Sequence, residues 1–187
     1  CRNTKHESVA LIRQTYNNLL GGNLKKNQTL CITPLNHIPD VKRRLSKVTK
    51  LIYRPDIDSE KRLREVLIEK NIDFIFTNPN KQNFKITERS LKGTNVKLIN
   101  TASTGLNHIE LDDCKRLGID VFSLTRDYEI IRKLPSTAEL GFGLLLSLIR
   151  KIPDSSNSVS IGEWDYEPYV GRQLSGMTAG IIGYGRL

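Results

Sequence analysis

The feature that most constrains this chain is an alternation of short apolar runs with helical patterns. Five runs are rich in the residues that favour β-strands, namely Leu30–Thr33, Leu51–Tyr53, Phe74–Thr77, Val96–Asn100 and Ile119–Ser123. Helical patterns separate them, at about Pro39–Lys47, at Ser59–Lys70, in a short stretch after Thr87, and at Leu111–Leu117. The alternation predicts an α/β fold with a parallel sheet and helices on both faces. Ligands of such sheets bind beyond the carboxyl ends of the strands, so the loops after Thr77 and Asn100 are the first candidates for a site.

A second unit is predicted to begin near Pro135. Ser136-Thr-Ala-Glu139 has the spacing of a capping box, which predicts a helix running to about Lys151. The helix body, Leu140–Ile149, is apolar on nearly all sides, so we expect it to be buried. A last strand is predicted at Thr178–Ile182. Residues 1–28 contain a helical apolar stripe, which fits either an added helix or the tail of a preceding domain.

Composition narrows the class of protein. The net charge is +9, but most basic residues alternate with acidic ones, as on a solvated helix face, and no nucleic-acid-binding motif is present. The three cysteines, Cys1, Cys31 and Cys114, lack the spacing of a metal site or a disulfide framework. The longest apolar run is shorter than the roughly 20 residues that span a bilayer. We therefore expect a cytoplasmic protein that binds no metal, nucleic acid or membrane.

Two glycine-containing loops are candidate binding sites. Gly183-Tyr-Gly185-Arg-Leu187 matches the first five positions of G-x-G-x-x-G, in which glycines let a pyrophosphate approach a helix start, although an ordinary glycine-rich turn has the same residues. Thr101–Asn107 consists largely of small residues, and its backbone amides could bind a carboxylate or phosphate. The alternative for this second loop is a turn whose Ser and Thr cap the next helix. His108 is interpreted as a hydrogen-bonded structural residue rather than a base.

Five segments in one order carry a resemblance to a known family. They are Thr101–Glu110, Cys114–Ile119, Thr137–Glu139, Gly162–Trp164 and Gly180–Arg186. Their order and spacing resemble the D-isomer-specific 2-hydroxyacid dehydrogenases, the family that contains phosphoglycerate, glycerate and formate dehydrogenases. The resemblance covers about residues 30–187.

This resemblance implies a division into domains and a function. Residues 29–134 would form a flavodoxin-like substrate domain, residues 135–187 would begin a Rossmann NAD(P)-binding domain, and residues 1–28 stay unassigned. The implied activity is an NAD(P)-dependent oxidoreductase acting on the CH–OH group of a small D-2-hydroxy acid. The full-length protein would be a homodimer with a small 2-hydroxy or 2-keto acid as its substrate.

The resemblance also assigns site residues. The substrate carboxylate would bind to Ser103, Thr104 and Gly105, and either Asn78 or Lys81 would meet a hydroxyl or an anion. NAD or NADP would bind to Gly183, Tyr184, Gly185, Arg186 and Leu187.

Some family features are missing from this sequence. The catalytic Arg, Glu and His of the family follow the glycine-rich loop, so we expect them beyond Leu187 and expect this chain alone to be inactive. The strands that would pair with Thr178–Ile182 are expected there too. In this chain the apolar helix, which a whole domain would bury, should therefore leave an exposed apolar patch. The loop Thr77–Lys81 has no arginine where phosphoglycerate enzymes would hold the phosphate, which argues against 3-phosphoglycerate as substrate. The alternative function is a non-catalytic, dehydrogenase-like binding or regulatory protein. The presence or absence of the three catalytic residues would distinguish the two.

Overall fold

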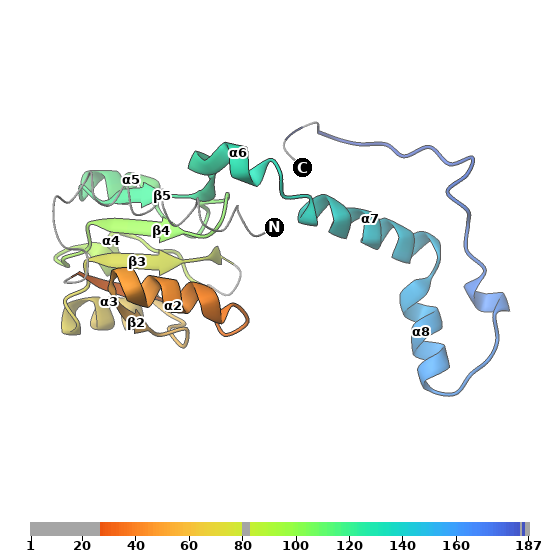
Figure 1. The fold of residues 1–187 in the computed structure, drawn as a ribbon, viewed down its shortest axis with the longest axis horizontal. Helices are drawn as coiled ribbons and strands as arrows, with labels where there is room; N and C mark the ends of the chain where they lie inside the picture. The colour runs from red at the N-terminus through yellow and green to blue at the C-terminus, as the bar shows by residue number, and fades with distance from the viewer. Residues whose placement is uncertain (1–26, 80–82, 184, 186–187) are drawn as a thin grey trace. The chain divides into compact units, whose positions relative to one another are not determined.

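The structure is a computed structural model that describes residues 27–79, 83–183 and 185, and it divides into two units, Cys1–Tyr128 and Glu129–Leu187 (Figure 1). The helical stripe expected within residues 1–28 lies outside the described residues, as do Lys81, Tyr184, Arg186 and Leu187.

The first unit is built on a parallel sheet of five strands. They are β1 (Gln28–Cys31), β2 (Lys50–Tyr53), β3 (Phe74–Thr77), β4 (Leu98–Thr101) and β5 (Asp120–Phe122). Every neighbouring pair is parallel, and the order across the sheet is β2-β1-β3-β4-β5. This is the flavodoxin-like order, so the predicted fold class is confirmed.

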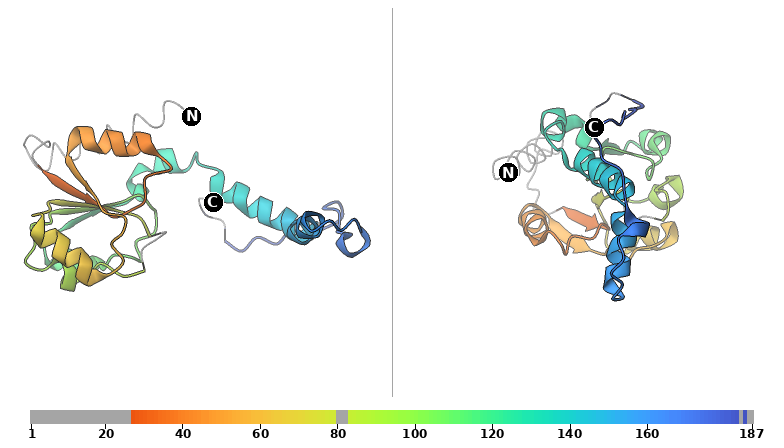
Figure 2. Two further views of the ribbon diagram at one scale, coloured as in Figure 1. Left: turned by 90° about the horizontal axis from the view of Figure 1, so that it is seen from below. Right: turned by 90° about the vertical axis from the view of Figure 1, so that its right-hand side faces the viewer.

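Helices cover both faces of this sheet. The helices between strands are α2 (Pro39–Val48), α3 (Glu60–Glu69), α4 (Glu88–Leu91) and α5 (Leu111–Arg116), and α6 (Tyr128–Ile131) follows the last strand. Helix α2 lies on one face, and α3 and α4 lie on the other (Figure 2). The arrangement follows from right-handed crossovers, because the chain moves one way from β1 to β2 and the other way from β2 to β5.

The core follows the two-residue period of the strands. Leu30, Ile75 and Ile99 point to one face, where they pack in one buried cluster with Leu63 of α3 and Leu91 of α4. The opposite face carries a smaller buried cluster made by one residue from each of three strands, Phe74, Leu98 and Phe122. A parallel sheet that is buried on both faces requires such continuous apolar runs, and these runs were the sequence signal.

Local sequence explains where several helices begin and end. The Ser59 hydroxyl accepts a hydrogen bond from the Arg62 amide at the start of α3, and Thr87 caps α4 by accepting from the Arg89 amide. Gly118 has a φ of 68° just after α5, in the left-handed region where glycine carries no steric penalty.

The second unit contains α7 (Ser136–Ile149), α8 (Ile152–Ser160) and the short 3₁₀ helix η4 (Glu167–Tyr169). The predicted capping box at its start is wrong. Pro135 occupies the cap position with near-helical backbone angles, and its carbonyl already accepts the Glu139 amide at 2.9 Å. Ser136 therefore lies inside the first turn, and no side chain caps the helix.

One further prediction for this unit is confirmed, namely the exposed apolar surface of α7, and another, the strand Thr178–Ile182, is wrong. Helix α7 has no buried residue, and Leu140, Leu144 and Leu148 are 63, 62 and 78% exposed, because no described part of this unit covers them. Thr178–Ile182 forms no strand, since pairing defines a strand and the described part of this unit contains none. The helix also ends at Ile149, and Lys151 adopts a left-handed conformation before α8 begins.

Gly171, in the segment after η4, packs closely against the end of α7. A Cβ atom at this position would lie 2.5 Å from the Ile149 carbonyl oxygen, so only glycine lets the backbone approach this closely. The Arg172 amide donates to the same carbonyl at 3.2 Å, which satisfies an acceptor left over at the helix end.

Among the described residues, none of the helices combines the length and the apolar character needed to cross a bilayer. The same residues contain no group of three or more His, Cys, Asp or Glu side chains placed to hold a metal ion.

Candidate functional site

The two loops selected from the sequence meet at the carboxyl edge of the sheet. Thr77 at the end of β3 pairs with Thr101 at the end of β4, and the Ala102 amide extends this ladder by donating to the Thr77 carbonyl at 2.9 Å. Asn78 and the segment that follows Thr101 therefore leave the sheet side by side. Ser103, Thr104 and Leu106 are half-buried, and Gly105 is exposed.

Three carbonyl groups of this loop are held by donors from other parts of the first unit or from the loop itself. The Asn78 side-chain nitrogen donates to the Ala102 carbonyl at 3.0 Å. The Leu124 amide donates to the Ser103 carbonyl at 3.0 Å. The Ser103 hydroxyl donates to the Gly105 carbonyl at 2.8 Å. The backbone of the loop is thus fixed at three of its peptides.

The amides that follow these carbonyls have no hydrogen-bond partner among the described residues. No cis peptide occurs among the described residues, and in a trans peptide the N–H points away from the preceding C=O. The amides of Ser103, Thr104 and Leu106 consequently point away from the groups that hold the loop. Within the described parts of the chain, they donate to no other group. Unused backbone donors at the edge of a parallel sheet can bind an anion without a basic side chain.

Asn78 has a supporting position in this arrangement. The sequence assigned it to a substrate hydroxyl or an anion, whereas the structure places its side-chain nitrogen on the Ala102 carbonyl. That contact holds the peptide whose other end is the Ser103 amide.

His108 is buried behind the same loop, with 6% of its surface exposed. Its Nε2 atom lies 2.9 Å from the hydroxyl oxygen of Thr101, a fully buried residue. Burial lowers the pKa of the His108 imidazole below its ordinary value of 6.5, because desolvation disfavours the charged ring. The interpretation of His108 as a hydrogen-bonded structural residue is confirmed.

A short bridge fastens the far end of the loop to the segment before α4. Ile86 pairs with Ile109, the Ile86 amide donates to the His108 carbonyl at 2.9 Å, and the Glu110 amide donates to the Ile86 carbonyl at 2.8 Å. The position of the loop therefore depends on the position of α4.

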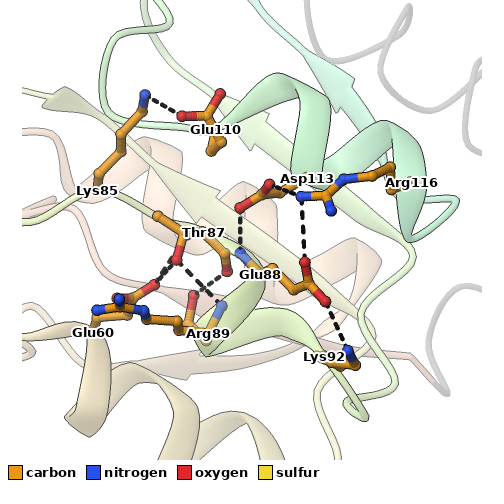
Figure 3. A network of polar contacts seen from close by, with 10 residues as sticks. Glu60, Lys85, Thr87, Glu88, Arg89, Lys92, Glu110, Asp113 and Arg116 are labelled. Carbon is orange, nitrogen blue, oxygen red and sulfur yellow. Dashed lines mark hydrogen bonds and ion pairs between the residues drawn. The ribbon is translucent and has the colours of Figure 1, made fainter.

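Helix α4 is itself held by a network of charged side chains (Figure 3). A carboxylate oxygen of Glu60 in α3 accepts from both the amide and the hydroxyl of Thr87, and Asp113 in α5 accepts from the Glu88 amide at 2.7 Å. At the other end, Arg64 donates to the Arg89 and Lys92 carbonyls. Carboxylates at the amino end of a helix and a guanidinium at its carboxyl end both interact favourably with the helix dipole and so stabilise the helix.

This network lines a hollow of about 610 Å³ between α3, α4 and α5, which does not include the loop after β4. Its carboxylates are occupied: the Glu88 amide and then Arg116 hold the pKa of Asp113 below its ordinary value. We regard the hollow as a structural ion network. Sequence inspection missed it because its members lie on three separate helices.

The glycine-rich segment at the end of the chain is described only at two positions. Gly183 has a φ of 94°, which a residue with a side chain rarely adopts, and both Gly183 and Gly185 have open space where a Cβ would project. These features fit a tight turn that a pyrophosphate can approach. Tyr184, Arg186 and Leu187, the other predicted cofactor residues, lie outside the described residues.

Comparison with known families gives two matches that follow each other along the chain. Residues 32–130 match the catalytic domain of the D-isomer specific 2-hydroxyacid dehydrogenases. Residues 142–187 match the NAD binding domain of the same family.

Curated relatives are similar over about half of the chain. D-3-phosphoglycerate dehydrogenase of Bacillus subtilis is 36% identical over 104 residues, which cover 55% of this chain and 19% of that enzyme. Hydroxypyruvate reductase of Thermotoga maritima is 35% identical over 95 residues, which cover 51% of this chain and 29% of that enzyme. The matches thus span less than a third of these relatives.

Solved structures share the fold. D-lactate dehydrogenase from Aquifex aeolicus, complexed with NAD and lactic acid, is 26% identical, with a TM-score of 0.60 over 86% of this chain and 45% of that chain. The apo-structure of D-lactate dehydrogenase from Escherichia coli is 21% identical, with a TM-score of 0.64 over 86% of this chain and 49% of that chain. Because one family model alone matches more than half of the 187 residues, the chain belongs to the D-isomer specific 2-hydroxyacid dehydrogenase family.

Proposed function

We propose that this chain supplies the substrate-binding part of an NAD(P)-dependent oxidoreductase that acts on the CH–OH group of a small D-2-hydroxy acid. Residues 29–134 form the substrate domain in this proposal, and residues 135–187 begin the cofactor domain. The nicotinamide supplies the hydride chemistry when it is bound. The chain's own residues bind and orient the acid, and Gly183 and Gly185 allow the cofactor pyrophosphate to approach the backbone.

The observation that carries this proposal is the set of unused amides after β4. Ser103, Thr104 and Leu106 each offer a backbone N–H whose preceding carbonyl is held by another group. Gly105 adds a fourth amide without an internal partner among the described residues, and it has no side chain to block a ligand. A carboxylate can accept several such bonds, and hydrogen bonds to a charged group are stronger than neutral ones.

The substrate is expected to be a small unphosphorylated acid. The loop Thr77–Lys81 carries no arginine, the residue that proteins use for bidentate recognition of a phosphate. The acid–base residues that family members place after the glycine-rich loop are absent from this sequence, so we expect the 187-residue chain alone to show no turnover.

The proposal also covers an exposed apolar stripe on α7 and the two buried cysteines. Helix α7 presents Leu140, Leu144 and Leu148 at four-residue spacing, all of them exposed, and we assign this stripe to a homodimer interface. Cys31 and Cys114 are free, buried thiols whose pKa burial raises to about 11, which makes them unreactive. Free thiols of this kind fit a cytoplasmic location.

Titration of the ¹⁵N-labelled chain with pyruvate tests the carboxylate site. We expect saturable shifts of the Ser103, Thr104, Gly105 and Leu106 amide resonances, with a dissociation constant on the order of millimolar for a few hydrogen bonds without a cofactor. Pyruvamide, which replaces the carboxylate by a neutral amide, serves as the matched control and should produce no saturable shift. Pyruvate shifts that are confined to residues outside the loop, or that pyruvamide reproduces, would remove the support for the proposal.

A further inference from the structure

Three side-chain hydrogen bonds run in sequence from the buried His108 to the loop. His108 Nε2 lies 2.9 Å from Thr101 Oγ1, and Thr101 Oγ1 lies 2.8 Å from Ser103 Oγ. Ser103 Oγ in turn lies 2.8 Å from the Gly105 carbonyl oxygen. The path begins at a buried ring beneath the sheet edge and ends at an exposed peptide.

The direction of every bond follows from counting protons. A carbonyl oxygen can only accept a hydrogen bond, so the Ser103 hydroxyl donates its single proton to the Gly105 carbonyl oxygen. The Ser103 hydroxyl oxygen must then accept a hydrogen bond from the Thr101 hydroxyl, which donates its own proton to it. Thr101 is left with lone pairs only, so His108 donates to it from Nε2–H. Burial lowers the pKa of His108, which favours the neutral ring, and the donor role toward Thr101 places the single proton of that ring on Nε2.

The last bond of this relay sets the orientation of one peptide. Glycine has an unusually wide choice of backbone conformations, so the peptide after Gly105 would rotate easily without a constraint. The Ser103 hydroxyl fixes its carbonyl, and planarity directs the Leu106 N–H to the opposite side. The Leu106 amide has no partner among the described residues, so this orientation serves no internal hydrogen bond.

We propose that His108 is a positioning residue which, through Thr101 and Ser103, holds the Leu106 amide in place for the carboxylate of the substrate. This inference rests on the proposed function of the loop. His108 touches neither substrate nor cofactor in this scheme. Its contribution is to organise a binding amide before the ligand arrives, so that less order has to be imposed on binding.

Three variants separate positioning from general stabilisation. His108→Phe keeps a ring but removes the donor, and we expect it to weaken pyruvate binding about 10-fold, the effect of one misplaced hydrogen bond to a charged group. His108→Gln can place an amide N–H where Nε2–H lies, so its affinity should stay within about 2-fold of the original. Thr101→Val removes the middle oxygen with almost no change of shape and should match the loss seen with His108→Phe.

The readout is the dissociation constant for pyruvate from amide shifts of the folded chain. Ile57→Ala is the control: Ile57 is buried in the main core cluster after β2, the edge strand separated from β4 by two others, so this variant loses stability but should bind pyruvate normally when folded. If His108→Phe does not fold, Thr101→Val decides the matter. Normal affinity in either folded variant would overturn the positioning role and leave the proposed function intact. Failure of the unaltered, folded chain to respond at the loop would overturn both.

Discussion

Replacing Ile99 by alanine is expected to lower the free energy of unfolding of the first unit by about 2–5 kcal/mol. Ile99 is fully buried in β4, a strand paired on both sides, and it packs in the main core cluster. The substitution removes its contacts and leaves a cavity that a sheet fixed on both sides cannot close. Urea unfolding followed by circular dichroism measures the change.

The matched control is Ile68→Ala. Ile68 lies on α3 with 54% of its surface exposed, and alanine is the better helix former, so this variant should stay within about 0.5 kcal/mol of the original. Equal losses for the two isoleucines would mean that β4 is not held between two neighbouring strands. The support of the loop after β4 would then need another explanation.

Replacing Leu144 by glutamate is expected to abolish association through α7. In a two-fold symmetric dimer each substitution counts twice, and each buried leucine contributes roughly 1.5–3 kcal/mol. The dissociation constant of the dimer should therefore rise at least about 100-fold. Glutamate has a helix propensity close to that of leucine, so α7 itself should persist. Sedimentation velocity over a concentration series measures the effect.

Leu111→Glu is the control for this experiment. Leu111 is an exposed leucine at the start of α5 in the first unit, where a carboxylate favours the helix dipole. Its association should be unchanged. A chain with its original sequence that stays monomeric at the highest concentration reached would contradict the assignment of α7 to a dimer interface, as would unchanged association of the Leu144→Glu chain.

Local pattern was sufficient to predict the elements of the first unit because a parallel sheet buried on both faces demands apolar runs at every strand. It was less accurate for their boundaries. The run Val96–Asn100 predicted the fourth strand, whereas β4 spans Leu98–Thr101, since its register is set by the pairing of Leu98 with Phe74 and Asp120. Pairing partners are distant in sequence, so no local window contains this information.

The second unit shows where local pattern fails. Thr178–Ile182 has the composition of a strand, but composition cannot supply a neighbour. The apolar body of α7 correctly indicates a helix, whereas its burial depends on surfaces that the described part of the unit does not provide. The capping box failed for a different reason, because the restricted backbone of Pro135 started the helix one residue early.

The candidate loop was predictable in part. Small residues after a strand indicated Ser103–Gly105, and the family resemblance gave them a role. The groups that organise the loop were not predictable, because Asn78, Leu124 and His108 reach it only through the folded sheet. Leu106, whose amide the relay orients, looks like an ordinary apolar residue in the sequence.

Amide hydrogen exchange at the end of β4 shows whether the loop keeps its backbone donors unused for a ligand. The Ala102 amide is bonded to the Thr77 carbonyl at 2.9 Å and should exchange slowly, whereas the next amide, Ser103, has no partner among the described residues. We expect fast exchange at Ser103, Thr104 and Leu106 without ligand, and slower exchange when pyruvate is added. Protection of these three amides as strong as that of Ala102 in the absence of any ligand would contradict this expectation.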